Sequence, residues 1–317
     1  MKTVFMGTPD FSCSVADALE ECGFEIAAVV TQPDKPAGRG MTLQASPVKK
    51  WAQQRNIPVL QPIKAREESF LQEMQKICPE LVVTAAFGQI LPQSVLDIPT
   101  YGCINVHASL LPLYRGASPI QQALLEGAKE TGITMMYMSA GMDEGDMILK
   151  RKIPIAEKDN AGTLFEKLAQ EAKLAVKDYA QLLQQGKPKG EPQNPQEATY
   201  CKKIEKSQGN IDWTMSAQEI VNLIRAMTPF PGAYSFFRGK RIKLLQASAE
   251  TAGHSELPGT VACVGKQSVA VACGDGLLNI EILQPEGKSA QAAGAFVNGY
   301  QPKVGECFER KMPENQK

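Results

Sequence analysis

A short segment that ends at a proline carries an asparagine and a histidine two positions apart. Asn105 and His107 follow the apolar Ile104 and precede Pro112, and His107 is one of only 2 histidines in the 317 residues. Because side chains alternate in direction along a strand, these two should project from the same face. A carboxamide and an imidazole side by side can donate hydrogen bonds to one developing oxyanion, which suits acyl transfer. The alternative is an ordinary strand end whose asparagine and histidine only satisfy neighbouring polar groups.

A glycine-rich loop further along the chain holds acids that could orient such an imidazole. Asp143, Glu144 and Asp146 lie close together there. A carboxylate beside a histidine favours its charged form, and the imidazole can then donate to the oxyanion or relay a proton. Spacing alone does not choose between the acids, and an ordinary acidic turn is the competing interpretation. The loop lacks the spacing of a calcium site and has no second histidine nearby, so we expect no metal.

The sequence around Asn105 and His107 resembles that of a known family. Residues 105–116 read NVHASLLPLYRG and resemble the N-x-H-x-S-L-L-P-x-x-x-G segment of folate-dependent formyltransferases. Within that superfamily, the chain is similar to the methionyl-tRNA formyltransferase family up to about Tyr300. The segments that carry this second resemblance read MGTPDF at 6–11, TQPDKPAGRG at 31–40, IDW at 211–213 and PFPG at 229–232.

The resemblance implies a one-carbon group transferase. Such an enzyme moves the formyl group of its co-substrate 10-formyltetrahydrofolate to the α-amine of initiator methionyl-tRNA, for translation initiation. Asn105 and His107 would be catalytic, Asp143 would pair with the histidine, and Asp146 would be structural. This chemistry needs no covalent enzyme intermediate, so the lack of a nucleophile pattern is no objection. The resemblance also implies that a segment made of Ser109, Leu110, Leu111 and Pro112 binds the folate. Residues 86–92 would form a further part of the same pocket.

The segment from Gln32 to Pro47 is long for a loop in a compact domain. Loops of more than about 12 residues are usually functional or disordered. The resemblance implies that this loop wedges into the acceptor end of the tRNA, with Arg39 at its Gly-Arg-Gly tip. Many relatives follow the tip with basic residues, whereas residues 41–44 here read MTLQ. This departure bears on how strongly the loop holds phosphate.

A stretch rich in basic and aromatic residues lies in the last third of the chain. Tyr234, Phe236 and Phe237 come just before four basic residues, at positions 238, 240, 241 and 243. Such a surface suits contact with an RNA backbone and stacking of its bases, and a solvated hairpin is the alternative. The candidate tRNA-binding residues are Arg39, Lys203, Lys206, Arg238, Lys240 and Arg241.

The elements that must position these residues alternate between strand and helix. Continuous apolar strands are typical of parallel sheets covered on both faces. We therefore predict an α/β fold with a doubly wound, mostly parallel, Rossmann-like sheet. The first strand-to-helix turn lacks two glycines of the dinucleotide-binding motif, so we expect no nucleotide there. The predicted strands lie at 2–6, 25–31, 59–60 and 81–85, and the helices at 11–19, 67–77 and 163–185.

A proline-rich polar stretch at 187–195 predicts a domain boundary. We expect a formyltransferase domain at 1–188 that binds the folate, a linker at 189–208 and a tRNA-binding domain at 209–317. After a helix at 216–225, short strands punctuated by glycines predict a small β-barrel of the OB-like kind. These strands are predicted at 233–237, 240–247, 259–264, 268–272 and 276–284.

The composition of the chain bears on RNA contact, cellular compartment and membrane association. Lysine plus arginine equals aspartate plus glutamate at 34 each, so any RNA contact must come from local patches. The 8 cysteines include no C-x-x-C pair, which fits reduced thiols in the cytoplasm. No run approaches the roughly 20 apolar residues that span a bilayer, so no membrane partner is expected. We expect a monomer.

Two rival functions remain open from the sequence. A related formyltransferase could use another amine acceptor, such as a sugar nucleotide or glycinamide ribotide, and the basic, aromatic second domain weighs against it. A catalytically inactive RNA-binding protein is the second rival. The intact set of Asn105, His107 and Asp143 weighs against that interpretation.

Overall fold

The computed structural model describes residues 1–37 and 42–310 of the chain, which divide into two compact units. Unit 1 comprises 1–119, 130–154 and 165–202. Unit 2 comprises the chain from Lys203 together with 120–129 and 155–164. Two short stretches that precede Lys203 in the sequence therefore belong with unit 2, which is continuous from Lys203 onward.

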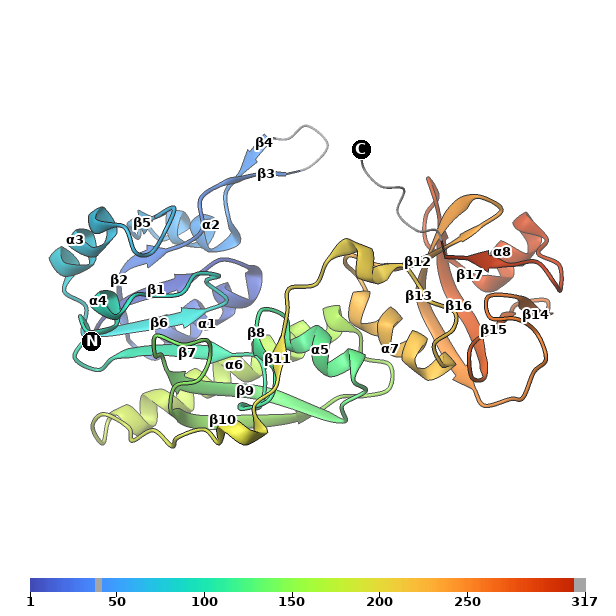
Figure 1. The fold of residues 1–317 in the computed structure, drawn as a ribbon. Coiled ribbons are helices and arrows are strands. Elements are labelled where there is room, and N and C mark those ends of the chain that lie inside the picture. Colours follow the sequence, from blue (N-terminus) through green and yellow to red (C-terminus); the bar gives the residue numbers. More distant parts are fainter. Residues whose placement is uncertain (38–41, 311–317) are drawn as a thin grey trace. The chain divides into compact units, whose positions relative to one another are not determined.

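Unit 1 is built on a seven-stranded sheet with the strand order β10-β9-β7-β6-β1-β2-β5 (Figure 1). The five strands from β7 to β5 are parallel, and β9 and β10 add an antiparallel edge beside β7. The predicted mostly parallel, Rossmann-like sheet is confirmed. Its strands are β1 (Lys2–Gly7), β2 (Glu25–Val30), β5 (Val59–Leu60), β6 (Leu81–Ala85), β7 (Cys103–His107), β9 (Glu130–Tyr137) and β10 (Met147–Pro154).

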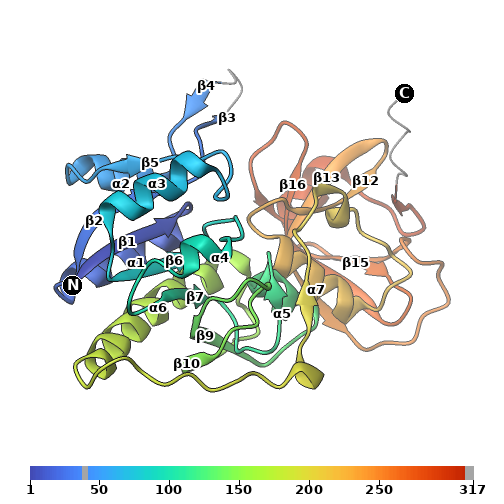
Figure 2. The same cartoon turned by 60° about the vertical axis from the view of Figure 1, so that its left-hand side comes forward.

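Helices cover both faces of this sheet, as Figure 2 shows. On one face, α3 and α4 pack their apolar residues against Val4, Met6 and Val82. On the other, α1 and α6 lie side by side, and Lys177 of α6 forms an ion pair with Glu21 of α1 at 3.0 Å. The helices are α1 (Asp10–Glu21), α2 (Pro47–Gln54), α3 (Glu68–Ile77), α4 (Gln93–Leu96) and α6 (Ala161–Leu183), with α5 (Pro119–Leu125) falling almost entirely in unit 2.

The long segment between Gln32 and Pro47 contains structure that its sequence did not predict. A short hairpin forms from β3 (Lys35–Ala37) and β4 (Thr42–Gln44). Helix α2 then begins with Pro47, whose lack of an N–H is tolerated at the first helical position. The Ser46 hydroxyl accepts a hydrogen bond from the amide of Lys49 at 3.0 Å and so caps this helix.

Unit 2 is a curled antiparallel sheet with the strand order β14-β15-β16-β13-β12-β18. Its two edges approach each other, because the Val261 amide donates to the Glu306 carbonyl and the Phe308 amide donates to the Gly259 carbonyl, both at 2.7 Å. The predicted barrel-like domain is thereby confirmed. Its strands are β12 (Ala233–Phe237), β13 (Lys240–Glu250), β14 (Val261–Val264), β15 (Val269–Ala272), β16 (Leu277–Pro285), β17 (Gln291–Ala292) and β18 (Phe308–Glu309).

Helices α7 (Ala217–Met227) and α8 (Ala293–Tyr300) contribute to the apolar core inside this sheet. Trp213, Phe237, Phe296 and Phe308 all lie in the core. Strands β12 and β13 are joined at Arg238 and Gly239, whose positive φ values of 49° and 76° match the type I′ turn favoured in two-residue hairpins.

A two-stranded parallel ladder inside unit 1 joins β8 (Arg115–Gly116) to β11 (Tyr200–Cys201). The chain just before unit 2 therefore lies against the loop that follows His107. Within the described residues, no helix is both long enough and apolar enough to cross a membrane.

Candidate active site

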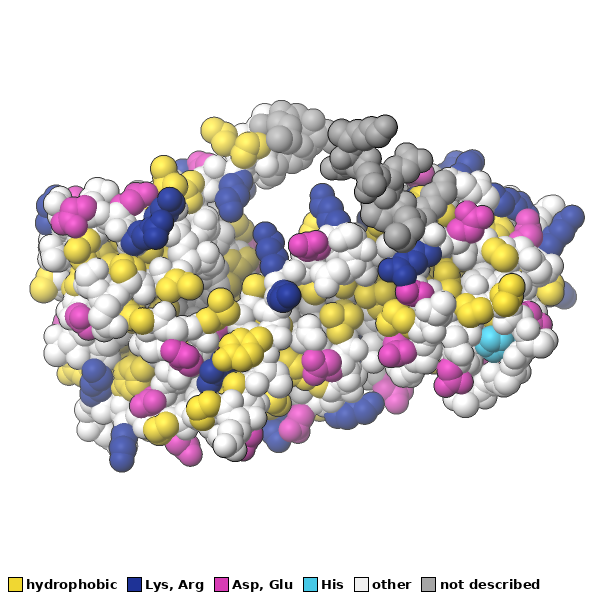
Figure 3. All heavy atoms as spheres, viewed as in Figure 1, with side chains coloured by type: hydrophobic (Ala, Val, Ile, Leu, Met, Phe, Trp, Pro, Cys, Tyr) yellow, Lys and Arg dark blue, Asp and Glu magenta, His cyan; other side chains and the backbone are white. Residues whose placement is uncertain are grey.

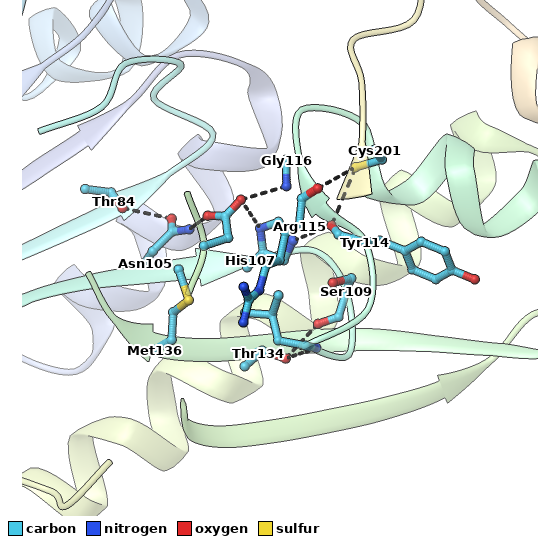
Figure 4. A network of polar contacts seen from close by, with 12 residues as sticks. Thr84, Asn105, His107, Ser109, Tyr114, Arg115, Gly116, Thr134, Met136 and Cys201 are labelled. Carbon is cyan, nitrogen blue, oxygen red and sulfur yellow. Dashed lines mark hydrogen bonds and ion pairs between the residues drawn. The ribbon is translucent and has the colours of Figure 1, made fainter. Parts of the chain in front are cut away.

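The predicted pair of side chains lies at the end of β7, between β6 and β9. Asn105 is partly exposed and His107 is buried. Asn105 Nδ2 lies 3.3 Å from Asp143 Oδ1, and His107 Nδ1 lies 3.7 Å from Asp143 Oδ2. Figure 4 shows both side chains turned toward one carboxylate. The expectation that they share a face is confirmed, and the structure selects Asp143 from the nearby acids.

Asp143 is held in an unusual backbone conformation. Its φ of 52° lies in the left-handed region, which costs free energy for a residue with a side chain. Its Oδ2 atom accepts a hydrogen bond from the Gly116 amide at 2.8 Å, which ties the loop to β8. Glu144 and Asp146 are exposed. The surrounding structure therefore presents one carboxylate, and not its neighbours, to Asn105 and His107.

The backbone of Tyr114 determines which nitrogen of His107 carries a proton. His107 Nε2 lies 3.0 Å from the Tyr114 carbonyl oxygen. A carbonyl can only accept a hydrogen bond, so Nε2 must be the donor. The Nδ1 atom is then the nitrogen that faces Asp143. The side chain of His107 is only 7% exposed, so its orientation is fixed by these contacts.

Thr84, at the end of β6, orients the amide of Asn105. The Thr84 hydroxyl donates to Asn105 Oδ1 at 2.8 Å, and the two residues are paired across the parallel strands. With its oxygen so occupied, the carboxamide must turn its NH2 group toward Asp143. One of the two N–H donors on Asn105 remains for a substrate. We did not predict Thr84, because the strand register that places it there is not visible in the sequence.

A second pair that we did not predict lies behind the Asp143 loop. The amide of Gln193 contacts the backbone carbonyls of Asp143 at 2.9 Å and Gly145 at 2.8 Å. Its oxygen accepts hydrogen bonds from Arg115 Nε at 3.0 Å and from a terminal nitrogen at 2.8 Å. Both side chains are buried. From the sequence, Gln193 is predicted only to lie in the linker.

The segment predicted to bind folate has most of its polar groups satisfied inside the protein. The Ser109 hydroxyl donates to the Leu113 carbonyl at 2.6 Å, and the Leu111 amide donates to the Thr134 hydroxyl at 3.1 Å. Leu110 and Leu113 are less buried than Leu111 and Pro112. Contact between residues 109–112 and a folate stays a prediction, and Leu110 is the one member of the segment that is partly exposed.

The base of the β3–β4 hairpin is anchored by polar contacts, whereas Arg39 lies outside the described residues. Asp34 forms an ion pair with Lys49 at 2.7 Å and accepts a hydrogen bond from Gln61 at 2.8 Å. The Lys49 ammonium and then the Gln61 amide hold the pKa of the Asp34 carboxyl below its ordinary value. Gln32 donates to the Phe87 carbonyl at 3.2 Å, so the hairpin base is tied to the strand-end loop after β6.

That loop after β6 also borders an open pocket. The pocket lies at the carboxyl ends of the strands, where ligands bind in open α/β sheets. Two of its lining residues, Lys64 and Arg66, are cations. The lining residues are Lys64, Ala65, Arg66, Gln89, Ile90 and Pro92.

In unit 2, the basic residues predicted to bind tRNA have different environments. Arg241 stacks on the ring of Tyr234 at 3.7 Å, and Tyr234 in turn packs edge-on against Phe236. Arg238 instead donates to Glu306 at 2.7 Å and to the Tyr300 carbonyl at 2.8 Å. The other three candidates are exposed lysines, namely Lys203, Lys206 and Lys240. Basic and acidic side chains are interspersed on the face seen in Figure 3.

Comparison with known proteins identifies the class to which this fold and site belong. A model of the formyl transferase family matches residues 1–178, and a model of the formyl transferase C-terminal domain matches residues 203–301. The chain belongs to the formyltransferase family, whose members are transferases of one-carbon groups.

Close relatives within that family carry a more particular name. The methionyl-tRNA formyltransferase of Marinobacter nauticus is 46% identical over 94% of this chain and 96% of its own length. That of Geobacter sulfurreducens is 44% identical over 96% of both chains. The resemblance to methionyl-tRNA formyltransferases that the sequence motifs indicated is confirmed.

Solved structures share the fold at lower sequence identity. Methionyl-tRNA formyltransferase from Clostridium thermocellum superposes with a TM-score of 0.54 at 20% identity, covering 80% of this chain and 95% of that one. The sugar 3N-formyl transferase WlaRD, solved with dTDP and 5-N-formyl-THF, gives a TM-score of 0.65 at 20% identity over 91% of this chain and 99% of that one.

Proposed function

We propose that this protein transfers the formyl group of 10-formyltetrahydrofolate to the α-amino group of methionine on initiator tRNA, and that it works as a cytoplasmic monomer. The observation that carries the catalytic part is the convergence of Asn105 and His107 on the carboxylate of Asp143. The identity of the acceptor is supported by relatives of nearly full length.

The reaction begins when the methionine nitrogen attacks the formyl carbon. The new C–N bond leaves negative charge on the formyl oxygen, and the remaining N–H of Asn105 stabilises that oxyanion. His107 can add a second donor only after its Nδ1 atom has taken the proton from the attacking nitrogen. Such a donor typically contributes about 3–4 kcal/mol to lowering the barrier. The bond from carbon to N10 of the folate then breaks, and the amine returns to neutrality.

One proton must pass from the attacking nitrogen to N10 of the folate. His107 Nδ1 carries the lone pair for this step, because Nε2 donates to the Tyr114 carbonyl. Asp143 lies 3.7 Å from Nδ1, so a carboxylate faces the proton while the imidazole holds it. Asp143 therefore supports the charge, and His107 carries the proton from one nitrogen to the other.

The folate is proposed to approach along two apolar segments, residues 86–92 and Ser109, Leu110, Leu111 and Pro112. The pocket beside the first segment carries Lys64 and Arg66, which suits the glutamate carboxylates of a folate. Replacing both cations with alanine should raise KM for 10-formyltetrahydrofolate without lowering kcat. A lowered kcat with unchanged KM would place the glutamate group elsewhere.

The tRNA is proposed to bind both units through several basic residues. Arg241 and Tyr234 form a preorganised cation and aromatic pair that suits an RNA backbone and its bases. Arg39 is proposed to contact the acceptor end. Because Arg238 already pairs with Glu306, it should contribute less to tRNA binding than Arg241 does. The further candidates are Lys203, Lys206 and Lys240.

The decisive experiment offers several acceptors to the full chain with formyl-labelled 10-formyltetrahydrofolate. Charged initiator tRNA, charged elongator methionine tRNA, an amino-sugar nucleotide and glycinamide ribotide would each be assayed for label. We expect label on the initiator methionyl-tRNA. Label on a small acceptor alone would establish a different formyltransferase, and binding of tRNA without turnover would establish an inactive RNA-binding protein.

A further inference from the structure

The amide of Gln193 uses its full hydrogen-bonding capacity inside unit 1. A carboxamide has two N–H donors and an oxygen with two lone pairs. The donors meet the carbonyls of Asp143 and Gly145, at 2.9 and 2.8 Å, and the oxygen meets two nitrogens of Arg115, at 3.0 and 2.8 Å. Rotating the amide by half a turn would set donors against donors, so only one orientation is compatible with these partners.

Arg115 makes this arrangement directional. Its side chain is buried, and in the described part of the chain no carboxylate forms an ion pair with it. Its remaining contacts are with Tyr200, whose hydroxyl accepts a hydrogen bond at 3.2 Å and whose ring centroid lies 5.8 Å from the guanidinium carbon. A buried guanidinium with a neutral partner polarises the amide of Gln193, which strengthens the hydrogen bonds that this amide donates. Those bonds end on the loop that carries Asp143.

We propose that Gln193 is a positioning residue for formyl transfer, which holds the backbone of Asp143 in the left-handed conformation that aims its carboxylate at Asn105 and His107. The inference rests on the proposed role of Asp143. Gln193 touches no reacting atom and acts through this loop. Asp143 has a φ of 52°, a conformation that persists only when neighbouring groups hold it, and Gln193 binds the carbonyl of that same residue.

Two substitutions separate positioning from simple packing. Gln193→Glu keeps the side-chain volume and gives Arg115 a carboxylate partner, but it removes both donors to the carbonyls of Asp143 and Gly145. We expect it to keep the melting temperature of the wild type while kcat falls roughly 10- to 100-fold, with KM for 10-formyltetrahydrofolate unchanged. Gln193→Ala should lower kcat similarly and also lower stability. Gln196→Ala, an exposed glutamine nearby, serves as the matched control.

The 2 histidines of the chain provide a spectroscopic readout of position. In protein labelled with ¹⁵N at its imidazoles, the signals of His107 should move in Gln193→Glu because its neighbour Asp143 moves. The signals of His254, whose Nδ1 lies near the Glu256 carbonyl in unit 2, should stay. A His254→Asn variant assigns the two sets.

Asp143→Asn, measured alongside, distinguishes the two ways of being wrong. If Asp143→Asn turns over as the wild type does, the proposed role of Asp143 fails. If Asp143→Asn loses turnover while Gln193→Glu retains it, or if Gln193→Glu slows turnover with the His107 signals unmoved, then positioning by Gln193 fails alone. Loss of turnover in both variants, with displaced His107 signals and an unaffected Gln196→Ala, supports the inference.

Discussion

At the scale of single residues, most hydrogen-bonding groups of the site are already paired within the protein. The Tyr114 carbonyl occupies Nε2 of His107, and the Thr84 hydroxyl occupies the oxygen of Asn105. Asp143 receives donors from Asn105 and Gly116. What remains is one N–H on Asn105 and the Nδ1 atom of His107, which are the two groups that the proposed mechanism uses.

The first prediction concerns His107. His107→Ala removes the proton carrier, which also becomes an oxyanion donor once Nδ1 holds the proton, so kcat should fall by roughly 10²–10⁴. KM for the folate and the melting temperature should change little. His254→Ala is the control, because that histidine lies in unit 2. A His107 variant with turnover close to that of the wild type would exclude the proposed mechanism.

The second prediction concerns Thr84. Thr84→Val keeps the shape of the side chain and removes the hydroxyl that orients Asn105. A neutral hydrogen bond is worth about 1 kcal/mol, so kcat should fall by about fivefold. Thr131→Val is the matched control, because Thr131 is also buried in a strand but its hydroxyl has no hydrogen-bond partner among the described residues. Equal effects of the two changes on kcat would contradict an orienting role.

The residues that sequence reasoning found and missed differ in how they act. Asn105 and His107 are visible because their spacing along one strand determines their common face. Tyr114 acts through a carbonyl, which every residue has, so no residue type marks it. Thr84 and Gln193 reach the site through strand register and through a return of the chain from a distant segment, and neither is encoded in local spacing.

At the scale of elements, the pairing of β8 with β11 leaves no room for a side chain at Gly116. A Cβ atom there would lie 2.3 Å from the Cys201 carbonyl oxygen, and φ is +116°, which favours glycine. Gly116 also donates its amide to Asp143. Packing of the ladder and placement of the Asp143 carboxylate therefore depend on the same residue.

The third prediction follows from this close approach. Gly116→Ala should separate β8 from β11, lower the melting temperature by several degrees and reduce kcat at least tenfold, as misplaced catalytic groups do. Gly299→Ala in α8 is the control, because nothing lies within 4 Å of its Cβ position. Unchanged kcat in Gly116→Ala would show that its amide is dispensable to Asp143.

The fourth prediction concerns Asp34 at the base of the β3–β4 hairpin. Hydrogen bonds from Lys49 and Gln61 lower the pKa of Asp34 in the folded state. The stability that its carboxylate contributes to the fold is therefore complete above the pKa of the unfolded chain, about 3.9. It is lost only as the pH falls through the lower, folded value. At neutral pH, Asp34→Asn should loosen the hairpin base and raise KM for charged tRNA, while KM for folate stays constant.

Glu73→Gln is the control for this change, since Glu73 also pairs with a lysine at 2.7 Å but lies on α3. If the wild type and Asp34→Asn differ in tRNA kinetics only below pH 4, the ionised carboxylate is not what anchors the hairpin. If folate kinetics change instead, the hairpin base belongs to the folate pocket.

Most elements could be predicted because their signals are local. Strand β12 matches its predicted bounds of 233–237, and the helix predicted at 163–185 is α6 (Ala161–Leu183). Helix α2 was missed although Ser46 and Pro47 provide a capping signal, because its 8 residues are few and follow a proline-rich loop. The antiparallel edge of β9 and β10 depends on pairing between strands, which periodicity does not reveal.

At the scale of the whole molecule, a net charge of zero means that tRNA must be held by local groups. The fifth prediction is that Arg241→Ala weakens tRNA binding and makes the slope of log K against log salt shallower, by about 0.7–0.9 for each lost phosphate contact. Arg238→Ala should mainly destabilise unit 2, because its guanidinium joins Glu306 to the end of α8. If the slope of log K against log salt is the same for Arg241→Ala and the wild type, Arg241 does not contact a tRNA phosphate.

The ladder between β8 and β11 also limits where this chain can be joined to a relative in a chimeric protein. A crossover in the proline-rich stretch before Gln193 would give Arg115 and Gly116 partners from the other parent, so the joint would fall inside unit 1. A crossover after Lys202 keeps that unit whole, yet residues 120–129 and 155–164, which belong with unit 2, would remain behind. No single crossover exchanges unit 2 cleanly. Chimeras should therefore be active when all three segments are inherited from one parent, and compromised when only the continuous C-terminal part is exchanged.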